Sequence, residues 1–468
     1  MNTDSSSIAV DPTQTPTKKR TVVAWSLWDW GSAAWNAVIT TFVFATWLTS
    51  SAFAPQDIVD AAEYSTQAKA QVDEVIALHS TWLSWATALA GVAIALAAPV
   101  LGARADSGGR RKLWLGINTA AVVLFSSSLF FITPDQAHLD RNVIIGLVIL
   151  ALGNIFFELA SVNYNAMLNQ ISTPVNRGKI SGIGWGAGYI GGIVLLLFLY
   201  FGFINPEVGL FGVTGDNGLD IRVSVLFAAL WFALFAIPVF VAVPEKPANK
   251  VHAALGVIAS YKKVGQDVAH LWRDDRNVLK FLFASAIFRD GLTGAFVFGG
   301  IIAIGTFGFT NASVLIFAIL ANVISGVATI LFGLFEDRVG SKPIIVFSLI
   351  GMIVSAVAIF LFHDRGQDIF WIFGLILCIF VGPVQSASRA TVSRLATPTS
   401  EGELFGLYAM TGRVVAFLSP ALFGVLVAVT NEQRYGILGI AAILLLGLFL
   451  VLPLRLTPQE RSAAHIPT

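Results

Sequence analysis

The amino-acid sequence predicts an all-α integral membrane protein with twelve transmembrane helices arranged as two six-helix bundles. Three observations support this fold class: an apolar composition, twelve apolar runs of membrane-spanning length, and an internal repeat that relates the two halves of the chain. Of the 468 residues, 56% are hydrophobic and 12% are charged, and the mean hydropathy is +0.77. Soluble globular proteins are far less apolar, so the composition excludes a soluble fold.

The apolar runs lie between charged breaks, and each is long enough to cross the roughly 30 Å hydrocarbon layer of a bilayer. They cover 22–49, 79–103, 113–132, 143–170, 180–203, 223–243, 278–305, 313–335, 343–362, 369–393, 404–429 and 435–454. The longest polar stretch between runs, 244–277, separates them into six and six. The polar residues 1–17 are typical of a disordered tail and lack the features of a signal peptide.

The distribution of the 29 lysines and arginines predicts the orientation of the chain in the membrane. Most of them lie on the side of the two termini. The opposite loops hold Lys69, Arg141, Arg222, Arg365 and Arg434, and the runs themselves hold Arg289, Arg389 and Arg413. Because cytoplasmic loops carry the excess of basic residues, we expect a cell-membrane protein with both termini in the cytoplasm.

This orientation completes the predicted domain organisation. We expect a disordered cytoplasmic tail over 1–21, an N-terminal six-helix bundle over 22–243, a cytoplasmic linker over 244–277, a C-terminal six-helix bundle over 278–454 and a cytoplasmic tail over 455–468. The acidic loop 50–78 is then expected on the outer side.

Three local matches relate the two halves of the chain. The segment GARADSGGRRK, which begins at Gly102, recurs as GLFEDRVGSKP at Gly333, and STPVNRGKISG at Ser172 recurs as ATPTSEGELFG at Ala396. A looser match places WDWGSAAW of the first run over RDGLTGAF of the seventh. The matched loops keep the same side of the membrane in both halves. The repeat is therefore parallel and indicates two bundles related by an axis along the membrane normal.

The loop after the second run resembles the signature loop of the major facilitator superfamily, and its weaker copy follows the eighth run, where that superfamily also keeps one. WDWGSAAW, NYNAMLNQIS, RGKISGIGWGAGYIGGI, GPVQSASR and GELFGLYAMTGR further resemble the vacuole-effluxer-like branch. That branch is named for a fungal vacuolar protein implicated in the export of amino acids after autophagy. The resemblance implies a transporter of small solutes, although Ser32 and Arg289 stand where the branch often has Asn.

The two copies of the loop are candidate conformational switches. Their glycines permit a tight turn, and Asp106 is expected to meet a positive helix N-terminus or an arginine across the bundle interface. The residues assigned to this role are Gly102, Asp106, Gly109, Arg110, Arg111, Gly333, Asp337 and Gly340.

Polar residues at helical spacing form stripes on the first, fourth, seventh and tenth runs, which line the central cavity in the superfamily that the chain resembles. A charge within the bilayer requires a partner or a wet cavity. The candidate substrate- and proton-binding residues are Asp29, Asn36, Glu158, Asn165, Arg289, Asp290, Gln385 and Arg389, with Trp25 and Trp35 as candidate cavity aromatics.

Each of these assignments has a structural alternative. Asp29 also fits a helix-packing charge near the interface, and Arg289 is placed to neutralise Asp290. The tryptophans also fit an interfacial belt. Arg389 fits either an anchor for a substrate carboxylate or a counter-ion for an acid of the first or fourth run. Arg413 is expected to be structural.

The pattern predicts a monomeric secondary transporter in the lipid bilayer that binds a small-molecule substrate and protons. A carboxylate among Asp29, Glu158 and Asp290 would exchange the proton while Arg389 attracts that acid or an anionic group of the substrate. An uncoupled facilitator and a non-transporting receptor or lipid scramblase remain as alternatives. No enzyme motif, metal site, cofactor or nucleic-acid partner is expected, because the sequence has no phosphate-cradling loop, metal-spaced histidines or basic bias.

Overall fold

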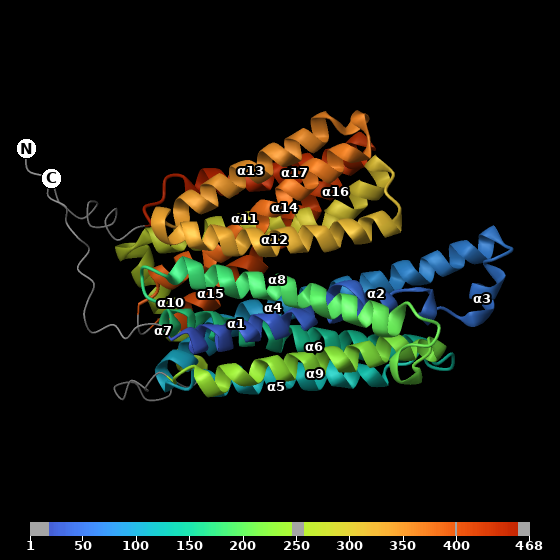
Figure 1. The fold of residues 1–468 in the computed structure, drawn as a ribbon, viewed down its shortest axis with the longest axis horizontal. Helices are drawn as coiled ribbons and strands as arrows, with labels where there is room; N and C mark the ends of the chain where they lie inside the picture. Colours follow the sequence, from blue (N-terminus) through green and yellow to red (C-terminus); the bar gives the residue numbers. More distant parts are fainter. Residues whose placement is uncertain (1–17, 246–256, 398–399, 457–468) are drawn as a thin grey trace, which may run out of the picture.

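The computed structural model describes residues 18–245, 257–397 and 400–456, which form helices and connecting loops without a β-sheet. The helices run along the long axis of the molecule in two groups, which Figure 1 shows converging at one end and diverging toward the other. We call the end that carries Asp106 and Asp337 the motif end.

The first bundle is formed by the N-terminal half of the chain. Its helices are α1 (Lys19–Ala34), which continues through a π-helical segment (Trp35–Phe42) into α2 (Phe44–Leu48), then α4 (Thr66–Gly108), α5 (Arg111–Ser128), α6 (Leu139–Ala166), α8 (Arg177–Leu199) and α9 (Leu219–Ala242). Two short helices, α3 (Gln56–Ala61) and α7 (Leu168–Ile171), lie in connections.

The second bundle is formed by the C-terminal half. Its helices are α11 (Arg276–Phe307), α12 (Asn311–Val339), α13 (Ser341–Leu361), α14 (Gln367–Leu395), α15 (Glu401–Val415), α16 (Leu418–Thr430) and α17 (Gly436–Val451). Helix α10 (Val257–Asp274) precedes this bundle.

Several of the predicted runs form interrupted helices. Among the described residues, eleven helical segments are long and apolar enough to cross a membrane, and the first run, divided by its π-helical segment, supplies the twelfth. The eleventh run breaks between α15 and α16, because Pro420 has no N–H to donate to the carbonyl of Ala416. The twelve-helix fold that the sequence predicts is confirmed, with irregular segments in several helices, among them a second π-helical segment at Tyr200–Ile204.

Two stretches that the sequence analysis treated as polar connections contain helices. The loop 50–78 holds α3 and the first turns of α4, a helix of 43 residues that starts where the Ser65 hydroxyl accepts the Ala68 N–H. The linker 244–277 holds α10. Both segments have helical propensity without an apolar run, so a search for membrane spans passes over them.

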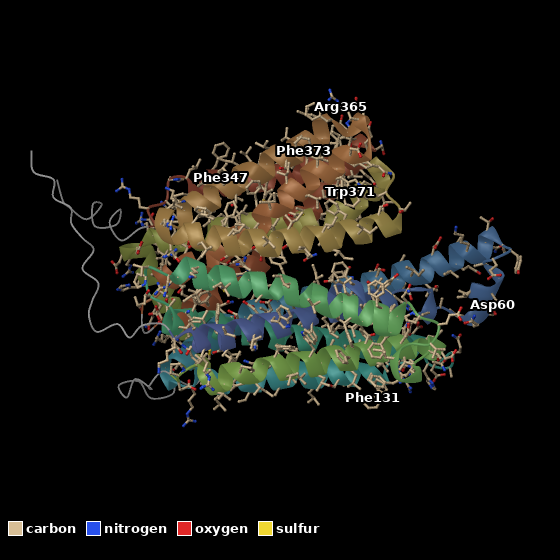
Figure 2. All side chains as sticks on the ribbon, viewed as in Figure 1. Asp60, Phe131, Phe347, Arg365, Trp371 and Phe373 are labelled. Atoms are coloured by element: carbon tan, nitrogen blue, oxygen red, sulfur yellow. The ribbon has the colours of Figure 1, made fainter. Side chains whose placement is uncertain are left out.

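Each bundle has its own apolar core, and the two cores meet near the motif end. The second core includes Ile94 and Ala98 of α4 together with Leu159 and Val162 of α6, all of which belong to the first bundle. The outer flanks are apolar as well, and Figure 2 shows exposed Phe131 on one bundle and exposed Phe347 on the other. The protein is thus a multi-pass membrane protein with lipid-facing sides.

Glycines allow the bundles to approach closely where α8 crosses α12. A methyl group added at Gly182 would lie 2.7 Å from the Thr329 carbonyl oxygen and 3.0 Å from the Gly333 Cα. At Gly186 it would lie 2.9 Å from the Gly326 carbonyl oxygen. These distances are below van der Waals contact. The motif end can therefore close only because glycine, which has no side chain, occupies these positions.

We therefore expect Gly182→Leu to destabilise the closed motif end by about 1–3 kcal/mol, the usual cost of overpacking. Spin labels at positions 179 and 338, on α8 and α12, should report longer distances than in the parent protein. Gly299→Leu is the matched control, because a Cβ at Gly299 meets no atom within 4 Å. Unchanged distances in the Gly182 variant would show that the interface tolerates the side chain.

Candidate functional site

The motif end is closed by two aspartates that cap helices of the opposite bundle. The Asp106 carboxylate at the end of α4 accepts the backbone N–H groups of Gly402 at 3.0 Å and Glu403 at 2.9 Å. Asp337 at the end of α12 accepts those of Gly178 at 2.7 Å and Lys179 at 2.9 Å. The first N–H groups of a helix have no partner within it and carry the positive end of its dipole, so each aspartate binds a helix N-terminus.

Arginines reinforce both caps. Arg111 contacts Asp106 within the first bundle and Glu401 across the interface. Arg394 lies 2.7 Å from Glu336 and 3.6 Å from Asp337. Of the two partners that the sequence proposed for Asp106, the helix N-terminus lies across the interface, whereas the arginine that contacts it, Arg111, belongs to its own bundle.

The glycines of the switch loops have two separate roles. Gly109 and Gly340 have φ angles of 58° and 88°, in the region where a side chain is strained. Gly102 and Gly333 instead lie against the backbone of Gly402 and Gly178 in the opposite bundle. The remaining switch residue, Arg110, is exposed.

These contacts obey the two-fold symmetry that the repeat predicts. In a symmetric interface, a contact between two residues recurs between their symmetry mates. The repeat aligns Asp106 with Asp337 and Gly402 with Gly178, and each aspartate binds the N-terminus that belongs to the other half. The four matched loops therefore form two symmetry-related pairs of contacts at the motif end.

One layer further into the membrane, Arg389 of α14 bridges the two bundles. Its guanidinium donates to Asp29 Oδ2 at 3.0 Å, to Asn165 Oδ1 at 3.2 Å, and to both the hydroxyl and the carbonyl oxygen of Ser181, at 3.0 and 2.6 Å. The Arg389 side chain is 3% exposed and the Asp29 side chain 17%. All three acceptor residues lie in the first bundle, on α1, α6 and α8. The charge is therefore satisfied entirely across the interface.

Aromatic rings enclose the same guanidinium. It lies 4.9 Å from the ring centroid of Trp25, 5.4 Å from that of Trp185 and 5.9 Å from that of Tyr164, within the range of a cation–π interaction. Gly184 leaves room for it, because a Cβ there would lie 2.8 Å from the guanidinium and 2.9 Å from Asp29. The Asp29–Arg389 ion pair is thus shielded from water on the side of α8.

The bridge lies on the pseudo-two-fold axis. Asn165 and Arg389 are 224 residues apart, the offset that relates the second pair of repeated loops, and so are Asn169 and Ser393, whose side chains are also hydrogen-bonded. Two residues related by a two-fold axis can touch only where both lie next to that axis. The Arg389 bridge is therefore central, between α6 and α14.

A second ion pair crosses the interface further from the motif end. Glu158 lies two turns from Asn165 along α6, about 10 Å away, and its carboxylate contacts Arg413 of α15. The two side chains are 26% and 25% exposed, so this pair is accessible where the Arg389 bridge is not. Arg413, which the sequence analysis expects to be structural, thus pairs with a candidate site residue.

The structure corrects the pairing predicted for the seventh run. Arg289 does not neutralise Asp290: its guanidinium lies 3.8 Å from the ring centroid of Tyr408 and donates to the Tyr408 carbonyl oxygen at 3.1 Å. Asp290 accepts the Ser419 N–H at 2.6 Å and thereby caps α16. Adjacent positions on a helix point about 100° apart, which separates the two charges.

The tryptophans predicted to line a cavity are buried inside the first bundle. Trp25 is 0% and Trp35 1% exposed. Trp25 stacks on Tyr164 with ring centroids 4.5 Å apart, and Trp35 packs on Phe157. Neither ring faces an open cavity, because stacking within the bundle buries more apolar surface.

The two remaining candidates both lie further from the motif end than the bridge. Asn36 is exposed on the π-helical segment, and the Gln385 amide donates to the Tyr189 hydroxyl at 3.4 Å. Sequence reasoning missed Ser181, Tyr164 and Trp185. Their only signal was proximity to polar or glycine-rich motifs. Within the described ranges, no cluster of three or more His, Cys, Asp or Glu has a metal-binding arrangement.

Solved structures identify the fold. The chain superimposes on the proton:xylose symporter XylE with a TM-score of 0.68 and 15% identity, covering 95% of this chain and 98% of that one. FucP in its outward conformation superimposes with a TM-score of 0.65 and 12% identity, covering 94% and 99%. These likenesses show that the two bundles have the fold of the major facilitator superfamily.

Sequence comparison identifies the family within that superfamily. Residues 17–464 match the family described as vacuole effluxer Atg22 like, and the chain belongs to it. The uncharacterized MFS-type transporter YxiO of Bacillus subtilis is 25% identical over 445 residues, 94% of this chain and 95% of that protein. Autophagy-related protein 22 of Cryptococcus neoformans is 24% identical over 277 residues, 56% of this chain and 47% of that protein.

The bridge predicts strong thermodynamic coupling between Asp29 and Arg389. We expect Arg389→Gln to destabilise the protein by about 3–5 kcal/mol, because it leaves a carboxylate unpaired within the membrane. Adding Asp29→Asn should recover part of that loss. A double-mutant cycle on thermal unfolding in detergent measures the coupling.

The exposed Asn36→Ala serves as the control, combined with Arg389→Gln in a second cycle that should be additive. If the Asp29 and Arg389 changes are also additive, the two residues do not interact in the dominant conformation.

Proposed function

We propose that the protein is a proton-coupled secondary transporter that moves a small polar solute across the cell membrane by alternating access. An amino acid or a related metabolite is the favoured substrate. The observation that carries this proposal is the Arg389 bridge: one charged residue on the symmetry axis holds both bundles together in the conformation described. That bridge must break when the motif end opens.

The excess of basic residues at the motif end favours a cytoplasmic location for that end. With the motif end in the cytoplasm, the conformation is closed to the cytoplasm. Opening inward would separate α14 from α1, α6 and α8 and leave Asp29 and Arg389 without each other. An unpaired carboxylate within the membrane is neutralised by a proton, and an unpaired guanidinium binds an anion. One movement therefore exposes both a proton site and a substrate site.

The accessible Glu158–Arg413 pair is the candidate first contact for the substrate. A carboxylate beside a guanidinium offers complementary charges to a solute that carries both an ammonium and a carboxylate group. This match supports an amino acid over a sugar. Because the Glu158 and Arg413 side chains are 26% and 25% exposed, a solute can compete for the two charges without first breaking the buried Arg389 bridge.

Asp290 is assigned a structural role. Its carboxylate is engaged with the N-terminus of α16 within one bundle, so rocking of the bundles leaves its partners unchanged. Among the three candidate acids, Asp29 is thus the proposed proton carrier and Glu158 the proposed substrate contact.

Transport in proteoliposomes tests these assignments after a thermal-shift screen against amino acids, peptides, sugars and organic acids has supplied a substrate. We expect Asp29→Asn to lose accumulation driven by a pH gradient but to retain substrate exchange. Glu158→Gln should raise KM about tenfold or more, the usual effect of losing a hydrogen bond to a charged group. Asp290→Asn should leave the coupling intact.

Coupling that survives in all three variants would contradict the proton mechanism. Parent flux that is indifferent to pH and membrane potential would favour an uncoupled facilitator. The absence of any saturable flux would favour a receptor or a lipid scramblase.

Single-cysteine labelling tests the orientation. The one native cysteine, Cys378, is buried, so it contributes little background. We expect Arg365→Cys, at the end opposite the motif end (Figure 2), to react with an impermeant maleimide in intact cells. Arg110→Cys should react only after permeabilisation. The reverse pattern would place the motif end outside and invert the transport model.

A further inference from the structure

Helix α10 has two faces with different environments. Its inner face packs Val264, Val268 and Leu271 against the core of the second bundle, and these residues follow helical spacing. The opposite face carries Lys262, Trp272 and Arg273, all of which are exposed. The inner face explains why the helix folds against the protein, but it leaves the outer face unexplained.

The outer face combines apolar and basic side chains. Ile258 is 86% and Trp272 58% exposed, and Arg276, at the start of α11, lies 5.5 Å from the Trp272 ring centroid. A face turned to bulk water would not favour Ile and Trp, and a face in hydrocarbon would not favour Lys and Arg. The combination is typical of a helix at the boundary of headgroups and acyl chains.

The charges on this face are predominantly positive. Both carboxylates of known position on the helix are engaged: Asp267 accepts from Lys263 at 2.5 Å, and Asp274 lies 2.9 Å from His270. Lys262, Arg273 and Arg276 therefore form an exposed basic patch. We call these three residues the α10 basic patch.

The position of α10 places this patch beside the bilayer. The Tyr261 hydroxyl donates to the carbonyl oxygen of Leu96 at 3.2 Å. Leu96 belongs to a stripe on α4, with Leu89 and Val92, in which each side chain is 59% exposed or more. An exposed apolar stripe on a transmembrane helix faces lipid, so Tyr261 reaches α4 at its lipid-facing surface.

We propose that α10 is an interfacial helix that binds anionic lipid headgroups through the α10 basic patch. Headgroup phosphates match the three cations, and Ile258 and Trp272 match the adjoining acyl region. The occupant is the anionic leaflet of the membrane that already surrounds the protein. This proposal concerns the lipid partner and does not rest on proton coupling or on the identity of the substrate.

Binding at α10 would be linked to closure of the motif end. The Lys263 ammonium lies 2.7 Å from Glu403 on α15, while Tyr261 holds α4, so the helix spans both bundles. Burial alone would lower the pKa of Lys263, but its hydrogen bonds to Asp267 and Glu403 raise the pKa above the usual lysine value, which keeps the ammonium charged. A lipid that holds α10 in this position stabilises the closed conformation.

Native mass spectrometry of the full-length protein tests the proposal with phosphatidylglycerol and phosphatidylcholine as probes. One basic residue near an anionic surface contributes about fivefold in affinity. We therefore expect Lys262→Gln/Arg273→Gln/Arg276→Gln to weaken phosphatidylglycerol binding at least about tenfold and to leave phosphatidylcholine binding unchanged. Hydrogen exchange in nanodiscs should show slower exchange over 257–274 with phosphatidylglycerol in the parent only.

Lys18→Gln/Lys19→Gln/Arg20→Gln is the matched control, because it removes three exposed basic residues at the same end. It should retain phosphatidylglycerol binding. An equal loss of phosphatidylglycerol binding in both triple variants would show that binding depends only on the overall charge of the motif end. That result would overturn the proposal. Parent protein that shows no preference between the two lipids would also overturn it.

Discussion

An arginine within a bilayer destabilises a protein unless its charge and its N–H groups find partners, and this requirement determines the centre of the structure. Among the described residues, the hydrogen-bond partners of Arg389 all lie in the opposite bundle. Asp29 supplies the counter-charge, Asn165 and Ser181 supply further acceptors, and three aromatic rings exclude water. The glycines of α8 let the helix approach closely enough for these contacts. The close approach of the bundles and the neutralisation of the charge are thus one interaction.

The sequence predicts the elements of this site that follow from periodicity and from charge. Twelve apolar runs, the parallel repeat and the polar stripes require only composition and spacing. A counter-ion role for Arg389 follows because an acid and a base in one membrane must neutralise each other. The choice of partner depends on three-dimensional packing. Asp290 accepts the N–H of Ser419, which has no partner within its own helix because the eleventh run breaks near Pro420. No pattern in the seventh run reveals that break.

Burial explains the other differences. Trp25 and Trp35 occupy positions on the polar stripe of the first run, but aromatic rings gain more from stacking with Tyr164 and Phe157 than from facing water. The search for apolar runs did not detect helix α10, because the helix carries too many charged residues. Its charge content places it outside any hydrophobic run, while Val264, Val268 and Leu271 mark an apolar face at helical spacing. A search for amphipathic helices in the linker would have found it.

The motif end has two sides, α4–α15 and α8–α12, which have symmetric backbone contacts but different charged contacts. On the α4–α15 side, Arg111 joins Asp106 to Glu401, and Lys263 of α10 adds a further tie to Glu403. The repeat places Lys342 where the first half has Arg111, and its ammonium binds the carbonyl oxygens of Leu452 and Leu454 in its own bundle. Both sides have close glycine contacts, so the α8–α12 side differs in lacking the counterparts of the Arg111–Glu401 and Lys263–Glu403 ion pairs among the described residues. Of these two sides of the motif end, α10 contacts α4 and α15. A lipid bound at α10 would therefore act on the α4–α15 side.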